Sequence, residues 1–178
     1  MKSNVKKITV AAVCLALAML LPFLTGQIQQ LGNALSPMHI PVLLCGFICG
    51  APYGFIIGLI SPILRFALFG MPPIFPKGII MVFELAAYGL SAGLLYKMLP
   101  KKIPNIYVSL ILSMLIGRTV AGIAKLVLVT FFAPNIPFGW AIFWTDYFVA
   151  ALPGIILHIV LIPVIVIALK KAKLIPNE

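Results

Sequence analysis

Apolar runs follow one another along the whole chain, and short polar or proline-rich segments separate them. A run of about 20 residues is long enough to cross roughly 30 Å of hydrocarbon as a helix, at a rise of about 1.5 Å per residue. Because backbone groups in lipid have no water to bond, each crossing is predicted to be a helix rather than an open strand. The pattern therefore predicts an all-α polytopic membrane protein, a single integral membrane domain over residues 1–178, with six transmembrane helices at about 8–24, 37–51, 53–69, 78–98, 106–132 and 146–169.

Proline and glycine mark the breaks between these runs. The dipeptide Ala51-Pro52 separates the second and third runs and is predicted to form a tight turn, because proline disfavours helical geometry in the residue before it. The segment FGMPPIFPK, at 69–77, carries three prolines and a glycine and is predicted to be a loop. A second loop, APNIPFGWAIFWT at 133–145, precedes the sixth run. The second helix is short and is expected to tilt or to lie deep in the membrane.

The charged residues support a membrane location and predict an orientation. Hydrophobic residues make up 63% of the chain and charged residues 9%, whereas a soluble domain carries about 25% charged residues. The net charge is +10, but nine of the 13 cations lie in three short patches between apolar runs, which is the positive-inside pattern rather than a nucleic-acid-binding face. Six crossings place both termini and the loop between the fourth and fifth helices on one side, predicted to be cytoplasmic. The patches comprise Lys2, Lys6 and Lys7; Lys97, Lys101 and Lys102; and Lys170, Lys171 and Lys173.

Ionisable residues also occur inside or beside the predicted helices, where they are costly and usually mark a site or a pathway. By their distance from the helix ends, these charges all lie at or outside the midplane of the membrane, opposite to the lysine patches. This one-sided distribution predicts a polar cavity that opens to the exterior above a sealed, apolar inner half. The candidate substrate-binding residues are Arg65, Glu84, Arg118, Lys125, Asp146, His39, Trp144 and Tyr147.

The charged candidates have a structural alternative. Cations outnumber carboxylates among them, which favours a ligand that carries a carboxylate or a phosphate. The same residues would equally suit structural ion pairs, with Lys77 and Lys125 extending their amines to the membrane interface.

The histidines and aromatic candidates have alternatives as well. A lone histidine in an apolar helix is more often a packing element than a ligand; His39 is retained as a candidate because it borders the polar loop at 25–36, and His158 is not. Trp144 and Tyr147 would stack on a flat ligand or anchor the chain at the membrane interface.

Small residues recur at every fourth position in two places, and such spacing lets helix backbones approach closely. The first set is expected to serve internal packing between the second and third helices. The second set, Ala12 and Ala16 on the first helix, suits either internal packing or a docking face for another membrane protein. The first set comprises Gly46, Gly50, Gly54 and Gly58.

The sequence carries no pattern of an enzyme. It has no GxxxxGK[ST] phosphate loop, no HExxH and no GxSxG motif, and it contains three acidic residues in all. Cys14, Cys45 and Cys49 lie inside apolar runs and are expected to act as small hydrophobes, so no metal site is predicted. Uphill transport by such a chain requires either an ion gradient or a separate ATP-hydrolysing partner.

With these residues in view, the chain resembles the substrate-specificity components of energy-coupling factor (ECF) transporters, the vitamin-capturing subunits of prokaryotic importers. The resemblance covers essentially the whole length. It depends on chain size, on six predicted helices and on the AxxxA pair at Ala12 and Ala16. It depends also on the stretch PMHIPVLLCGFICGAPYGFIIGLISPILRFALFGMPP at 37–73 and on MVFELAAYGLSAGLLY at 81–96.

This resemblance implies a binding protein of the bacterial cell membrane whose outer loops cover a vitamin, with the loop at 25–36 as a lid. It implies further that the AxxxA face docks onto a transmembrane coupling subunit joined to two ATPase subunits, which use the ATP, and that the loaded subunit topples within the membrane to release its ligand. No cofactor is expected in this chain itself.

Two other functions remain open from the sequence, as does the substrate. A self-contained ion-coupled transporter usually shows inverted repeats, and the two halves of this chain show no such symmetry. A membrane scaffold would not need a one-sided set of charges. The cation excess favours an acid such as pantothenate, whereas the aromatic residues would suit a flat ring such as pyridoxine or a pterin.

Overall fold

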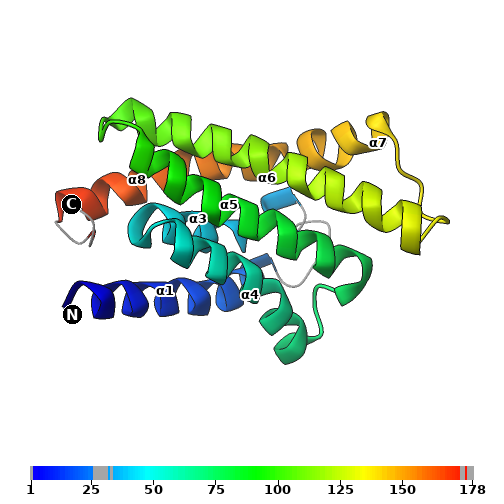
Figure 1. Cartoon of the computed structure of the whole chain (residues 1–178), viewed down its shortest axis with the longest axis horizontal. Coiled ribbons are helices and arrows are strands. Elements are labelled where there is room, and N and C mark those ends of the chain that lie inside the picture. Colours follow the sequence, from blue (N-terminus) through cyan, green and yellow to red (C-terminus); the bar gives the residue numbers. More distant parts are fainter. Residues whose placement is uncertain (1, 26–31, 33, 173–174, 176–178) are drawn as a thin grey trace.

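The computed structural model describes residues 2–25, 32, 34–172 and 175, and within these the chain is helical without strands. The helices pack side by side along one long axis (Figure 1). α5 packs against α3, α4 and α6, and α1 packs against α3 and α4. The main elements are α1 Lys2–Leu20, α3 His39–Cys49, α4 Ala51–Phe69, α5 Ile79–Met98, α6 Ile103–Phe132, α7 Trp140–Trp144 and α8 Leu152–Lys171.

Five helical segments are long and apolar enough to cross a membrane: Asn4–Leu24, Ala51–Phe69, Ile74–Met98, Ile103–Phe132 and Leu152–Lys171. The second of the six predicted transmembrane helices is shorter than the predicted range 37–51. α3 has 11 residues, which at about 1.5 Å per residue gives a length of about 16 Å, roughly half of the hydrocarbon thickness. The membrane-protein class is therefore confirmed, whereas α3 is too short to span the bilayer by itself.

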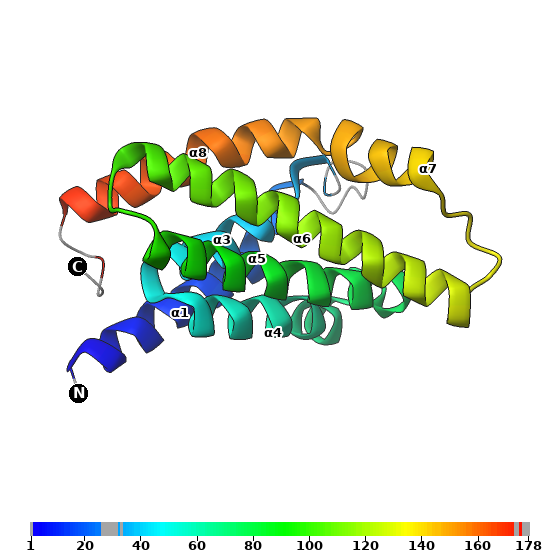
Figure 2. The ribbon, with the colours of Figure 1, turned by 45° about the horizontal axis from the view of Figure 1, so that its top comes forward.

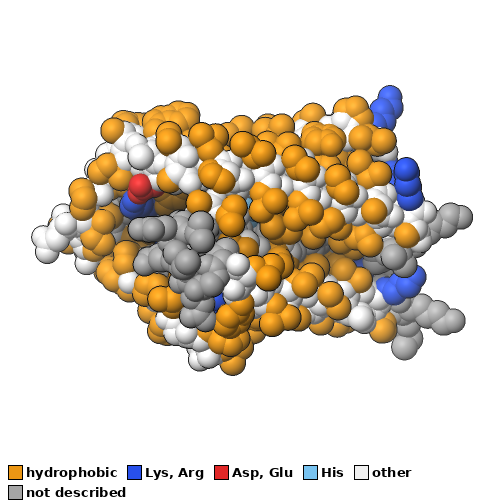
Figure 3. Space-filling view, turned by 180° about the vertical axis from the view of Figure 1, so that it is seen from behind, with side chains coloured by type: hydrophobic (Ala, Val, Ile, Leu, Met, Phe, Trp, Pro, Cys, Tyr) orange, Lys and Arg blue, Asp and Glu red, His pale blue; other side chains and the backbone are white. Residues whose placement is uncertain are grey.

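The two ends of the bundle differ in charge. α1 begins, α5 ends, α6 begins and α8 ends at the same end of the bundle, called here the lysine end (Figures 1 and 2). Basic side chains gather at that end and hydrophobic side chains cover the middle of the bundle (Figure 3). At the opposite end, called here the distal end, α4 and α6 end and α5 begins. The assignment of the lysine end to the cytoplasm stays a prediction.

The turn between α3 and α4 differs by one or two residues from the predicted one. It is centred on Gly50, whose φ of 95° lies in the region that favours glycine, and not on Ala51-Pro52. Pro52 lies in the first turn of α4, where its missing N–H leaves no helical hydrogen bond unmade.

Two predicted loops contain helical turns. At the end of the predicted loop 69–77, Ile74–Gly78 forms a helical turn with a kink at Phe75. This turn leads directly into α5. The second predicted loop ends in α7, and a π-helical turn, Thr145–Val149, follows it. The predicted helix 146–169 is consequently interrupted before α8. The physical reason is Pro153 in the first turn of α8, because proline cannot donate the hydrogen bond that a continuous helix would need there.

Glycine allows α3 and α4 to lie almost in backbone contact with α5. A Cβ atom on Gly46 or Gly54 would overlap the carbonyl oxygen of Gly89, and a Cβ on Gly58 would overlap that of Leu85. The predicted small-residue spacing therefore serves internal packing in three of its four members, and Gly50 forms the turn. All of α3 is buried, so the bundle is sealed around it.

Candidate functional site

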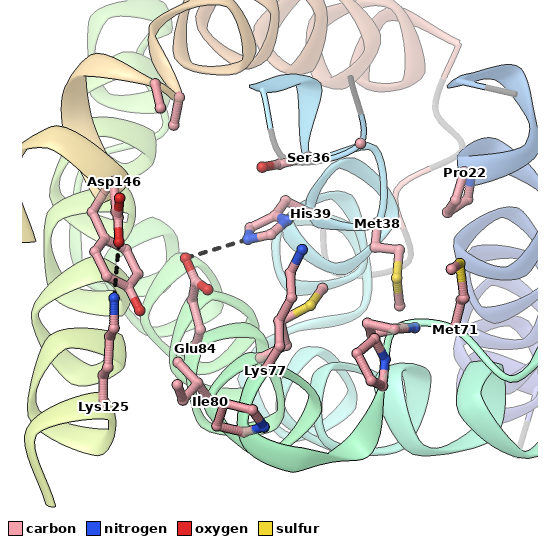
Figure 4. A pocket seen from close by; sticks show the side chains of 18 of the residues that line it. Pro22, Ser36, Met38, His39, Met71, Lys77, Ile80, Glu84, Lys125 and Asp146 are labelled. Carbon is pink, nitrogen blue, oxygen red and sulfur yellow. Dashed lines mark hydrogen bonds and ion pairs between the residues drawn. The ribbon is translucent and has the colours of Figure 1, made fainter. Parts of the chain in front are cut away.

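A cavity of about 510 Å³ opens at the distal end of the bundle. It lies above the start of α3, and it is enclosed by the end of α1, the turn before α5, the distal half of α6 and the turn Thr145–Val149 (Figure 4). Because α3 begins at His39, about half a membrane thickness from the lysine end, α3 does not fill the space distal to it. The volume lies within the range of about 300–1,000 Å³ that is typical of small-molecule sites.

Seven of the eight candidate substrate-binding residues line this cavity, although they come from α3, α4, α5, α6 and the turn at 145–149. Trp144 does not line it. Whether any of the seven contacts a ligand stays a prediction. The seven are His39, Arg65, Glu84, Arg118, Lys125, Asp146 and Tyr147.

The walls of the cavity differ in chemistry. The wall beside the end of α1 is apolar, with Pro22, Met38 and Met71 directed to one side of the opening (Figure 4). Polar side chains occupy the opposite wall and the floor. Sequence reasoning missed the apolar wall, because methionine and proline in an apolar chain carry no signal that separates a cavity lining from ordinary packing. Lys77, which the sequence analysis noted without assigning it to the site, also faces the cavity (Figure 4).

Glu84 and His39 meet at the floor of the cavity. The imidazole Nε2 of His39, in the first turn of α3, lies 3.4 Å from the carboxylate Oε1 of Glu84 on α5 (Figure 4). Glu84 is 8% exposed and His39 is 6% exposed. The carboxylate therefore lies close to a nitrogen that can donate a hydrogen bond to it.

Lys125 and Asp146 form an ion pair at the mouth of the cavity. The Lys125 Nζ donates a hydrogen bond of 2.8 Å to Asp146 Oδ2, which joins α6 to the turn at 145–149. The side chain of Asp146 is about half exposed, at 49%. Because exposed pairs contribute about 0–1 kcal/mol, this pair fixes the position of Asp146 without adding much stability.

Arg65 is held by structural contacts. Its guanidinium donates a hydrogen bond to the carbonyl oxygen of Met19 and lies over the rings of Phe23 and Phe69, 5.0 Å and 5.3 Å from their centroids. These contacts tie the end of α4 to the end of α1. The structural alternative for Arg65 therefore has direct support, although the residue also lines the cavity.

Arg118 is different, because no hydrogen bond within the described part of the chain satisfies its Nε. It is 5% exposed, and the centre of its guanidinium lies 5.6 Å from the ring centroid of Phe148. A buried guanidinium with a free donor in a cavity wall is suited to bind an anion.

A buried polar cluster extends beneath the floor. The ring of His39 lies 5.1 Å from that of Tyr88 and 6.0 Å from that of His158, between ring centroids. His39 Nδ1, the Tyr88 hydroxyl and His158 Nε2 have no hydrogen-bond partner in the described structure. Sequence reasoning missed Tyr88, although its position four residues after Glu84 places both side chains on one face of α5.

The charges that line the cavity do not cancel. Four cations against two carboxylates leave an excess of two positive charges when the histidines are neutral. The cations are Arg65, Lys77, Arg118 and Lys125, and the carboxylates are Glu84 and Asp146.

Trp144 belongs to an aromatic group outside the cavity. Its ring lies 4.4 Å from that of Phe148, and Trp144 is 54% exposed, while Trp140 is 80% exposed. Exposed tryptophans at the distal end fit anchoring at the membrane interface, which was the structural alternative for Trp144.

Ala12 and Ala16 lie on an exposed face of α1, whereas Ala11, Cys14 and Ala18 on the same helix are buried. The alanine pair is therefore not used for packing inside this chain. The predicted lid at 25–36 falls largely outside the described residues, including Gln27, Gln29, Gln30 and Asn33.

An all-helical membrane protein with a polar cavity of this size at one end of its bundle has the form of a small-molecule-binding membrane protein. The family model described as "ECF transporter, substrate-specific component" matches residues 6–166, and the chain belongs to that family. No curated protein and no solved structure matches the chain. It is thus a substrate-binding component of an ECF transporter.

Proposed function

We propose that the chain captures a small, anionic, vitamin-like solute at the outer face of a bacterial cell membrane and delivers it for ATP-driven uptake. The observation that carries this proposal is the excess of two positive charges in a cavity of about 510 Å³. Ionisable groups within a membrane are costly, so an unbalanced set of them favours a ligand that supplies the missing charge.

The orientation follows from the lysine end. Lys6, Lys7, Lys101 and Lys170 lie at the end of the bundle opposite to the cavity, and the positive-inside rule places such patches in the cytoplasm. The cavity then opens to the exterior, where an importer first meets its substrate.

The ligand carries a carboxylate or a phosphate in this proposal, and pantothenate is one example. Arg118 supplies a free guanidinium N–H, and charge-assisted hydrogen bonds to such a group are about twice as strong as neutral ones. The apolar wall at Met38 and Met71 accommodates the rest of the molecule.

The partners follow from the family and from the exposed face of α1. A substrate-specific component works with an ECF module of a transmembrane coupling subunit and two ATPase subunits, which use the ATP. Ala12 and Ala16 lie on the surface of α1, and their small side chains let another helix approach closely. We therefore infer that this face docks onto the coupling subunit, and no cofactor is assigned to this chain.

The proposal is tested by purifying the protein, identifying by mass spectrometry any small molecule that comes with it, and titrating a vitamin panel. Saturable binding of an anionic compound without its chemical conversion supports capture. If nothing co-purifies and no panel compound binds, a scaffold function replaces it. Uptake by liposomes that contain this chain alone, driven by an ion gradient, would establish a self-contained transporter instead.

A further inference from the structure

Glu84 places a negative charge in the cavity, which is unexpected if the cavity binds an anion through its positive charge alone. Asp146, the other carboxylate of the lining, is already bonded to Lys125 at 2.8 Å. Glu84 is buried, and its polar neighbours in the described structure include His39, whose Nε2 lies 3.4 Å from Oε1, and Tyr88. A carboxylate at this depth would repel an anionic ligand unless a donor on the ligand bonds to it.

The hydrogen-bonding capacity around Glu84 is incompletely used. An ionised carboxylate has about four positions that accept a hydrogen bond, and one contact to Oε1 leaves most of them open to the cavity. Lys77 faces the same space (Figure 4) and supplies a positive charge there.

The surrounding side chains offer both donors and acceptors. Arg118 Nε and His39 Nδ1 have no hydrogen-bond partner in the described structure, and both residues line the cavity. A buried polar group that stays unpaired destabilises the protein. Two such groups next to one cavity indicate that something which enters the cavity completes them.

We propose that the floor of the cavity binds a polar group that both donates and accepts hydrogen bonds, such as an amide or a nitrogen heterocycle, and that its donor is directed at Glu84. This inference rests on the proposed function and narrows the substrate class. The ligand then has two features: an anionic group that offsets the positive excess, and an N–H or O–H donor that Glu84 accepts.

The proposal makes a prediction whose sign separates it from simple charge balance. Glu84→Gln keeps the size of the side chain and removes one negative charge from the cavity. If Glu84 only lowers the net positive charge of the cavity, an anionic ligand binds this variant more tightly. If Glu84 accepts a hydrogen bond from the ligand, the ligand binds at least tenfold more weakly, because a neutral amide is a poorer acceptor and offers one oxygen instead of two.

Asp146→Asn is the matched control. It also removes one negative charge from the lining, but its carboxylate is already occupied by Lys125. Asp146→Asn is therefore expected to tighten the binding of an anion, while Glu84→Gln weakens it. Both variants are compared with the wild type without ligand by thermal unfolding, so that only folded proteins enter the comparison.

The experiment uses the full chain in lipid nanodiscs and titrates it with pantothenate, folate, pyridoxine, nicotinate, nicotinamide, biotin, riboflavin and thiamine. Affinities of both variants are then measured for each compound that binds the wild type. Opposite changes in the two variants support the inference. Equal or tighter binding by Glu84→Gln overturns it and leaves the capture function intact. If no compound binds the wild type and none co-purifies, the proposed function fails, and this inference fails with it.

Discussion

Arg118 offers the sharpest test of the candidate site, because its guanidinium is buried and has few contacts of its own. It is 5% exposed, its Nε has no hydrogen-bond partner in the described structure, and its aromatic contact is with Phe148 at 5.6 Å. The change Arg118→Ala removes the donor and the charge together.

The expected loss follows from the strength of a hydrogen bond to a charged group, which is about 1.5–3 kcal/mol. This corresponds to a rise in Kd of roughly tenfold to 150-fold. Stability without ligand should change little or rise, because a buried donor without a hydrogen-bond partner, such as Arg118 Nε, is itself destabilising. The combination of weakened binding with undiminished stability is typical of a functional residue, since sites often hold groups that disfavour the folded state.

The assay is calorimetric titration of a ligand that binds the wild type, together with thermal unfolding of the ligand-free protein. Arg65→Ala serves as the comparison, because Arg65 donates to the carbonyl of Met19 and lies against two aromatic rings. That variant is expected to unfold at a lower temperature. An unchanged Kd in Arg118→Ala would refute the reasoning, and so would a loss of stability as large as that of Arg65→Ala.

Three further predictions concern packing, docking and the cavity mouth. Ala12→Trp and Ala16→Trp should abolish uptake in cells and leave ligand affinity unchanged, since both residues are exposed on α1; weaker ligand binding would contradict a docking role. Gly54→Val should lower the free energy of unfolding by about 1–3 kcal/mol or more, and with it the unfolding temperature, because its side chain would overlap the backbone of α5. Gly139→Val places its side chain in open space and should leave the unfolding temperature unchanged. Lys125→Met should change the free energy of unfolding by less than about 1 kcal/mol, as measured by denaturant titration, and a larger loss would show that this ion pair is a structural element.

The sequence predicted the membrane class and most helices because apolar run length is a local signal. It failed where the ends of helices depend on neighbours. The sequence predicts a short second helix at 37–51, and α3, at His39–Cys49, is shorter still by two residues at each end. The interruption before α8 depends on Pro153, and the helical turns at 140–149 directly follow the stretch APNIPFG at 133–139, whose turn-forming residues favour a loop.

For the candidate site, the sequence predicted which residue types gather in the distal half and did not predict their partners. Depth along a helix is readable from residue number. The sequence therefore places Arg118 near the middle of its helix and Lys125 two turns further out, and both residues line the cavity at the distal end. Pairing is not readable in this way. Glu84 meets His39 and Asp146 meets Lys125 only because α3, α5 and α6 pack together, and Trp144 turns away from the cavity because α7 lies outside it.

The shortness of α3 links the fold to the site. A helix that crossed the whole membrane at this position would fill the space that the cavity occupies. Because α3 begins only at His39, the first turn of the helix faces the cavity, and the imidazole Nε2 of His39 lies 3.4 Å from the carboxylate of Glu84. The close backbone contact of α3 and α4 with α5, which Gly46 and Gly54 permit, then seals the space beneath. A ligand held above α3 is therefore separated from the lysine end by a buried helix and not by a loop. Release toward that side requires movement of the bundle or of its orientation in the membrane, which is work that a separate ATP-driven module can supply.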